Sequence, residues 1–121
     1  MRAKLSDLEI RRATGELPGW TRKGDAITKT YSFARFADGI RFVQQIAEVA
    51  DAMDHHPDID IRYTKVTFTL STHDAGGITQ LDLDLAKKIE ETAATDDELF
   101  AFAMGVPQPS ETVDDLFAGL S

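Results

Sequence analysis

Pro57 separates two hydrophobic patterns that have different periods, and this change limits the folds open to the chain. Before the proline, apolar residues recur at three- and four-residue steps, which predicts one long helix. After it, apolar and polar residues alternate over 59–71, which predicts two strands joined near Thr64 and Lys65. Because residues before a proline are pushed out of helical geometry, His55 and His56 should lie at or just past the helix end. The helical stripe consists of Phe36, Ile40, Val43, Ala47, Ala50 and Met53.

Two capping signals predict further helices on either side of this region. Ser6 and Glu9 have the spacing of a capping box, in which two side chains satisfy backbone amides at a helix start, and Gly15 should end this helix. Thr79 and Asp82 repeat the spacing and predict a helix that runs to about Ala93.

A hairpin is predicted between the first two helices. From Trp20 to Arg35, a turn at Lys23-Gly24 precedes apolar residues that alternate with polar ones. Short hairpins separated by helices are typical of an α+β domain, in which an antiparallel sheet has its helices packed on one face. The alternating apolar residues are Ile27, Tyr31 and Phe33.

The length of 121 residues is usual for a single domain. We expect this domain to span 1–94 and residues 95–121 to form a short helical C-terminal extension, with a capping box at Thr95 and Glu98. Acidic residues surround the apolar side chains of the extension. We expect these side chains to complete the core or an oligomer contact rather than to bind another protein. They are Leu99, Phe100, Phe102, Val113, Leu116 and Phe117.

Charge and composition argue against several classes of protein. The net charge is −8 and the 13 lysines and arginines are scattered, which argues against direct binding to nucleic acid. Apolar runs fall far short of the roughly 20 residues needed to cross a bilayer, so we expect no membrane association. The absence of cysteine excludes a disulfide framework and a thiolate nucleophile, and it fits a cytoplasmic protein.

All three histidines flank the predicted strand pair: His55 and His56 precede it, and His73 follows it. Imidazoles give and take protons near neutral pH, and nearby carboxylates could orient them. The residue pattern alone leaves acid–base catalysis, metal binding and a structural helix-end role open. Adjacent histidines point in different directions, which weakens the metal interpretation. The carboxylates are Asp51, Asp54, Asp74 and Asp82.

A specific set of motifs accompanies these histidines. The segment Asp-Ala-Met-Asp-His-His-Pro at 51–57 is followed by Tyr63-Thr-Lys-Val66, by Leu70-Ser-Thr-His73 and by Asp82. With Gly19-Trp20 and Asp25-Ala26-Ile27, this combination resembles the pterin-4a-carbinolamine dehydratase family from about Leu17 to Ile89. The resemblance implies a four-stranded antiparallel sheet, assembly as a homodimer or homotetramer, and no metal or organic cofactor. It also implies a lyase that dehydrates 4a-hydroxy-tetrahydropterin to quinonoid dihydropterin in tetrahydropterin recycling.

The same resemblance assigns roles to individual residues. His55 and His73 would transfer protons, and His56 would mainly bind substrate. The other assigned positions have structural alternatives, such as a core aromatic at Trp20 and a helix cap at Asp82. Those that resemble substrate-contacting positions are Asp54, Ser71, Thr72 and Asp74, and those that resemble supporting positions are Asp51, Trp20 and Asp82.

The resemblance does not extend to Ile59 and Asp60, which stand where many family members carry an aromatic that could stack on the ligand. The alternative function is a protein-interaction module without a major catalytic role, because animal relatives also serve as dimerisation cofactors of a transcription factor. The three histidines and the acidic signature favour the enzyme.

Overall fold

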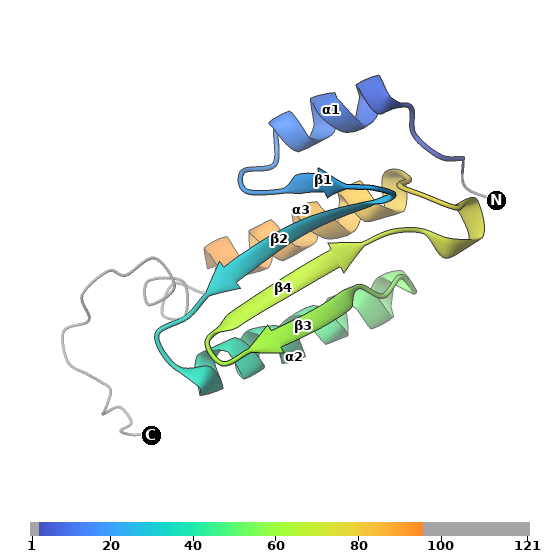
Figure 1. Cartoon of the computed structure of the whole chain (residues 1–121). Helices are drawn as coiled ribbons and strands as arrows, with labels where there is room; N and C mark the ends of the chain where they lie inside the picture. The colour runs from blue at the N-terminus through green and yellow to red at the C-terminus, as the bar shows by residue number, and fades with distance from the viewer. Residues whose placement is uncertain (1–2, 96–121) are drawn as a thin grey trace.

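The structure is a computed structural model that describes residues 3–95, which form one sheet and three α-helices (Figure 1). The helices confirm the predicted order of elements, including the capping box of Ser6 and Glu9. The elements are α1 (Asp7–Gly15), β1 (Thr21–Lys23), β2 (Ala26–Ser32), α2 (Phe36–Met53), β3 (Asp58–Arg62), β4 (Lys65–Leu70), the 3₁₀ turn η1 (His73–Ala75) and α3 (Gln80–Thr95).

The four strands pair antiparallel in the order β1-β2-β4-β3, which confirms the predicted fold class. The register places Ile27 opposite Leu70 and Ile61 opposite Val66, so the apolar side chains share one face. The other face is polar, and the hydroxyls of Thr30 and Thr67 lie 2.7 Å apart across it.

The helices α2 and α3 cover the apolar face of the sheet, and α1 lies beside the β1 edge (Figure 1). Phe42 of α2 packs into an aromatic group on the sheet, with ring centroids 5.3 to 5.8 Å from those of its neighbours. Its aromatic neighbours are Tyr31, Phe33 and Phe68. This layer of rings joins the two central strands to the long helix.

The buried face of α2 differs from the predicted stripe. The helix has the predicted bounds, but Phe36 and Ile40 are exposed, whereas Phe42 and Ile46 are buried. Two overlapping patterns of apolar residues run along this helix, and packing against the sheet selects one of them. The unselected residues leave an apolar surface near the start of α2.

Both predicted strand turns lie one residue away from their observed positions. Lys23 pairs with Ala26, so the first turn is Gly24-Asp25, where Gly24 has the positive φ that such turns require. Arg62 pairs with Lys65, so Tyr63 belongs to the second turn, with φ of 55°, and not to the strand.

The predicted helices of the C-terminal extension, from residue 96 onward, lie outside the described residues. The preceding helix α3 ends at Thr95, slightly beyond its predicted end. Within residues 3–95, no helix is both long enough and apolar enough to cross a membrane.

Candidate active site

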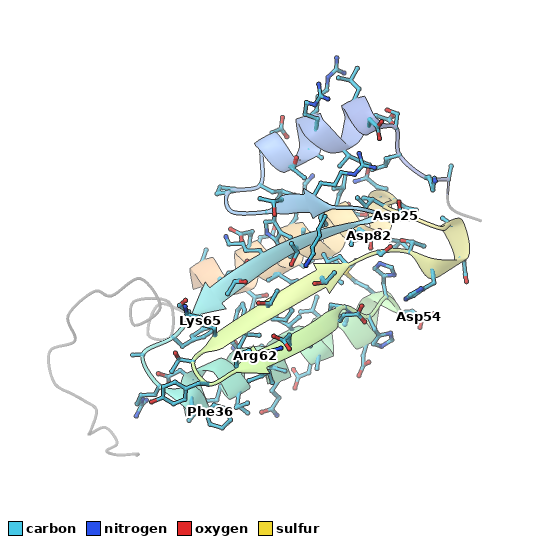
Figure 2. The ribbon with its side chains drawn as sticks, in the orientation of Figure 1. Asp25, Phe36, Asp54, Arg62, Lys65 and Asp82 are labelled. Carbon is cyan, nitrogen blue, oxygen red and sulfur yellow. The ribbon has the colours of Figure 1, made fainter. Side chains whose placement is uncertain are left out.

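One cavity of about 550 Å³ opens where α2 ends, β4 ends and α3 begins. Figure 2 shows Asp54 and Asp82 at this end of the molecule and Phe36 at the opposite end. The lining residues come from two short segments and the first turn of α3. They are Asp54, His55, His56, Ser71, Thr72, His73, Asp74 and Leu81.

The end of α2 presents the first segment to the cavity. Asp54, which directly follows the last helical residue Met53, adopts a left-handed conformation with φ of 53° that ends the helix. The backbone N–H of His55 then donates to the carbonyl of Ala50 at 3.1 Å. This bond ties His55 to the last helical turn, so its side chain starts from a fixed backbone position. His55 thus lies just past the helix end, as expected from the position of Pro57.

The His55 ring is held by a buried carboxylate. Nε2 of His55 lies 2.6 Å from Oδ1 of Asp82, and the Asp82 side chain is fully buried while the His55 side chain is 11% exposed. The second oxygen, Oδ2, accepts from the Thr72 hydroxyl at 2.8 Å and from the Thr79 backbone N–H at 2.9 Å. Asp82 thus joins the loop after β4, the start of α3 and the end of α2 behind the cavity.

The neighbouring histidine has a different and more open environment. Nε2 of His56 lies 2.8 Å from Oδ1 of Asp51 on the last turn of α2, and both side chains are exposed. Solvent screens such a pair, so Asp51 orients His56 more weakly than Asp82 orients His55. The two adjacent imidazoles therefore differ in their freedom to move.

The second segment is a compact loop between β4 and α3. Thr72 and Gly77 form an antiparallel bridge, and the backbone N–H of Thr72 donates to the carbonyl of Gly77 at 2.9 Å. This bridge closes the loop that carries His73 and Asp74 on η1. The Ser71 hydroxyl donates to the carbonyl of Asp25 at 2.8 Å, which ties the cavity wall to the β1–β2 turn.

The structure brings most of the predicted site residues together. Asp51 and Asp82 do not line the cavity, but each contacts a histidine that does. Trp20 is placed elsewhere: it is buried, and its indole N–H donates to Oε2 of Glu90 at 3.1 Å. This position favours the interpretation of Trp20 as a core aromatic.

Two residues of the site were not singled out from the sequence. Leu81 adds an apolar surface to the cavity, and Thr79 connects to Asp82 behind it. The spacing of Thr79 and Asp82 predicted the start of a helix. That spacing could not predict that either residue contacts a side chain on another element. In residues 3–95, no group of three or more histidine, aspartate or glutamate side chains is arranged to hold a metal ion.

The geometry is typical of an acid–base site. It combines imidazoles in one cavity, a carboxylate that orients one ring, and hydroxyl and carboxylate groups that could bind the polar edge of a ligand. The fold and this site together define a small α+β protein whose side chains could move protons on a small molecule.

Comparisons with known proteins agree with this class. Residues 3–92 match the family described as pterin 4 alpha carbinolamine dehydratase. A protein of Roseiflexus sp. strain RS-1, provisionally named as a pterin-4-alpha-carbinolamine dehydratase, is 54% identical over 91 residues, which cover 75% of this chain and 98% of the relative. The chain belongs to the pterin-4a-carbinolamine dehydratase family.

Solved structures share the fold. A crystal structure described as a transcriptional coactivator/pterin dehydratase from Brucella melitensis has a TM-score of 0.71 and 34% sequence identity, and the match covers 74% of this chain and 97% of that one. A pterin dehydratase-like protein described as a RuBisCO assembly factor has a TM-score of 0.50 and 20% identity, over 60% of this chain and 84% of that one. This second likeness concerns the fold alone.

Proposed function

We propose that the protein dehydrates 4a-hydroxy-tetrahydropterin to quinonoid dihydropterin and water by histidine acid–base catalysis. The observation that carries the proposal is the convergence of His55, His56 and His73, from two separate segments, on one cavity. Membership of the family supports the same substrate class. In this role the protein would serve tetrahydropterin recycling, and a cytoplasmic location stays a prediction.

The reaction requires two proton movements. The C4a–O bond breaks as a proton is delivered to the leaving hydroxyl, and the proton on the adjacent ring nitrogen is removed as the C=N bond forms. We assign these transfers to His55 and His73, since each lines the cavity. Asp82 would orient His55 through its Nε2, which leaves Nδ1 as the nitrogen available for proton transfer.

The remaining cavity residues would bind the pterin. We assign substrate contacts to His56, Asp54, Ser71, Thr72 and Asp74, and support of His56 to Asp51. Polar groups on both segments could meet the polar edge of a pterin ring, and Leu81 could contact its flat face. The mechanism assigns no step to a metal or organic cofactor.

A homodimer or homotetramer is part of the proposal. Phe36, Ile40, Ile59 and Ile61 are between 36% and 50% exposed, at α2 and β3. An apolar surface of this kind on a small domain is typical of a contact with another chain or segment.

The decisive experiment is a stopped-flow assay in which the carbinolamine is generated in the cuvette and its dehydration is followed with and without the protein. We expect catalytic amounts of protein to accelerate dehydration. No acceleration by folded protein would contradict the proposal and favour the alternative, a protein-interaction module without a major catalytic role.

A further inference from the structure

Thr79 carries a buried hydroxyl that lies behind the cavity and does not line it. The side chain is fully buried and directly precedes the first residue of α3. Its Oγ1 accepts from the backbone N–H of Leu81 at 3.2 Å, as a capping residue does. The same oxygen lies 2.7 Å from Oγ1 of Thr72. Thr79 therefore contacts both the helix end and the group that reaches Asp82.

The direction of each hydrogen bond follows from the number of hydrogens. A threonine hydroxyl carries one hydrogen, and an ionised carboxylate carries none. Thr72 Oγ1 lies 2.8 Å from Oδ2 of Asp82, so Thr72 donates its hydrogen there. Thr72 then has no hydrogen for Thr79, and Thr79 must donate across the 2.7 Å contact. The chain of donors runs one way, from Thr79 through Thr72 to Asp82.

This chain determines which Asp82 oxygen faces His55. Oδ2 receives the Thr72 hydroxyl and also the Thr79 backbone N–H at 2.9 Å. Oδ1 is the oxygen that lies 2.6 Å from Nε2 of His55. Because the carboxylate only accepts, Nε2 must carry a hydrogen, and the neutral ring has Nδ1 as its acceptor.

Ser6 provides a matched capping residue with no link to the cavity. Its Oγ accepts from the N–H of Glu9 at 3.1 Å, and Oε1 of Glu9 accepts from the N–H of Ser6 at 2.8 Å. Both bonds serve the start of α1. Thr79 differs because its hydroxyl, besides capping α3, donates its hydrogen to the Thr72 hydroxyl, which belongs to no part of the helix.

We propose that Thr79 is a positioning residue for His55. Its hydroxyl holds the Thr72 hydroxyl toward Oδ2 of Asp82, which keeps Oδ1 in place for Nε2 of His55. Without the Thr79 donor, the Thr72 hydroxyl is no longer held toward Oδ2, so the carboxylate can turn and the ring loses its fixed position, although Nε2 still carries its hydrogen. The inference concerns the ring state of His55, and only its effect on turnover rests on the proposed function.

The test compares Thr79→Val, which removes the hydroxyl at similar shape, with Thr79→Ser, which keeps it. Imidazole ¹⁵N chemical shifts distinguish the two neutral tautomers. We expect the Nε2–H form in all three proteins, with sharp His55 ring signals at the same positions in the wild type and in Thr79→Ser, and with shifted or broadened His55 ring signals in Thr79→Val. The kcat of Thr79→Val should fall on the order of 10-fold, with KM nearly unchanged. This is the low end of the loss seen when a residue that orients a functional histidine is replaced.

Ser6→Ala is the control for the loss of a helix cap. It should lower the melting temperature but leave the His55 signals and kcat unchanged.

Several results would overturn the inference. One is the finding that His55 of the wild-type protein is in the Nδ1–H form, and this measurement requires no variant. Others are unchanged ring signals in folded Thr79→Val, or equal changes in Ser6→Ala. If Thr79→Val does not fold, the His55 ring signals of Thr79→Ala are compared with those of the wild type, and unchanged signals would again overturn the inference. If the wild type has no dehydratase activity, the proposed function fails, but the ring spectra still test the role of Thr79.

Discussion

Asp82 serves two elements with its two carboxylate oxygens. Oδ2 accepts the backbone N–H of Thr79 at the start of α3, and Oδ1 contacts Nε2 of His55 at the end of α2. The structural and functional interpretations of this residue are therefore compatible. A helix start is a rigid part of a protein, so a carboxylate that caps it can hold a catalytic ring in a fixed position.

We predict that His55→Ala and His73→Ala each reduce dehydratase turnover by about 10² to 10⁴, the contribution of a positioned acid or base. His56→Ala should mainly raise KM, because we assign His56 to substrate binding. Stopped-flow kinetics measure both effects, and the fluorescence of the single Trp20 reports whether each variant is folded. A folded double variant with near wild-type turnover would refute the assignment.

Asp54 combines a cavity position with an unusual backbone. Its φ of 53° lies in the left-handed region, which glycine adopts most readily and aspartate tolerates. We predict that Asp54→Gly keeps or slightly raises the melting temperature but lowers kcat/KM about tenfold, since a charge-assisted hydrogen bond to substrate is worth about 1.5 kcal/mol or more. Unchanged kcat/KM would show that the carboxylate does not contact the substrate.

We predict that the purified protein holds no stoichiometric zinc and that chelators leave its activity unchanged. The reason is that the chain has no cysteine and that, in residues 3–95, the histidines and carboxylates are not arranged as a metal-binding group. Elemental analysis and a chelator titration measure this. One tightly held metal per chain, with activity lost on its removal, would replace the acid–base mechanism with a metal-assisted one.

The β1–β2 hairpin and α3 are joined by a second polar group, remote from the cavity. Oε2 of Glu90 on α3 accepts from the Trp20 indole, from Nζ of Lys29 at 2.5 Å, and from the Tyr31 hydroxyl. Burial, and then the hydrogen bond and charge of Glu90, raise the pKa of Tyr31 well above its ordinary value of 10.0. Only the protonated tyrosine can donate to Glu90, so this one of the three contacts is lost when Tyr31 ionises.

This pKa shift predicts a loss of stability at high pH. A pKa raised in the folded state contributes stability that is complete below about pH 10 and is lost progressively as the pH rises above it. We expect the free energy of unfolding to fall above pH 10. Tyr31→Phe should weaken that dependence and reduce stability at pH 7 by about 1.5 kcal/mol, through the lost bond to a charged acceptor. Urea titrations from pH 7 to 11 measure both effects.

The matched control for Tyr31→Phe is Tyr63→Phe, since Tyr63 is 77% exposed on the β3–β4 turn. It should leave the stability at pH 7 and its dependence on pH unchanged. Equal behaviour of the two variants would contradict the role of the buried tyrosine.

The cavity and an exposed apolar surface lie toward opposite ends of the described domain. The cavity lies where α2 finishes and α3 begins, and the exposed apolar residues Phe36 and Ile40 lie near the start of α2, toward the other end (Figure 2). Residues 96–121, which follow α3, contain acidic and apolar side chains but no lysine or arginine. We propose that the domain ends near residue 94 and that the extension serves stability or assembly.

Deletion of residues 96–121 should therefore lower the melting temperature or the number of subunits, and leave kcat of the folded protein largely intact. The apolar residues of the extension would each cost about 1.5 to 3 kcal/mol to leave exposed, so they should pack on the domain or on a second subunit. Sedimentation velocity and thermal unfolding test this. Unchanged values of both, or folded protein without activity, would contradict the prediction.

Local pattern was sufficient to predict the elements of this fold. The capping box of Ser6 and Glu9, the helix that ends before Pro57 and the alternation along β4 depend on residues that are close in sequence. The histidines and the motif around them could also be recognised as candidates without a structure. Hydrophobic period and helix capping act over a few residues, which is why these features can be read from the chain itself.

Contacts between distant residues were decided only by tertiary packing. Asp82 meets His55 across 27 positions, and Trp20 meets Glu90 across 70, so no local pattern could predict either pair. The same holds for α2, where the sheet buries Phe42 and leaves Phe36 exposed although both fit a helical period. A period restricts which residues share a face, but the shape of the opposing surface selects the face that is buried.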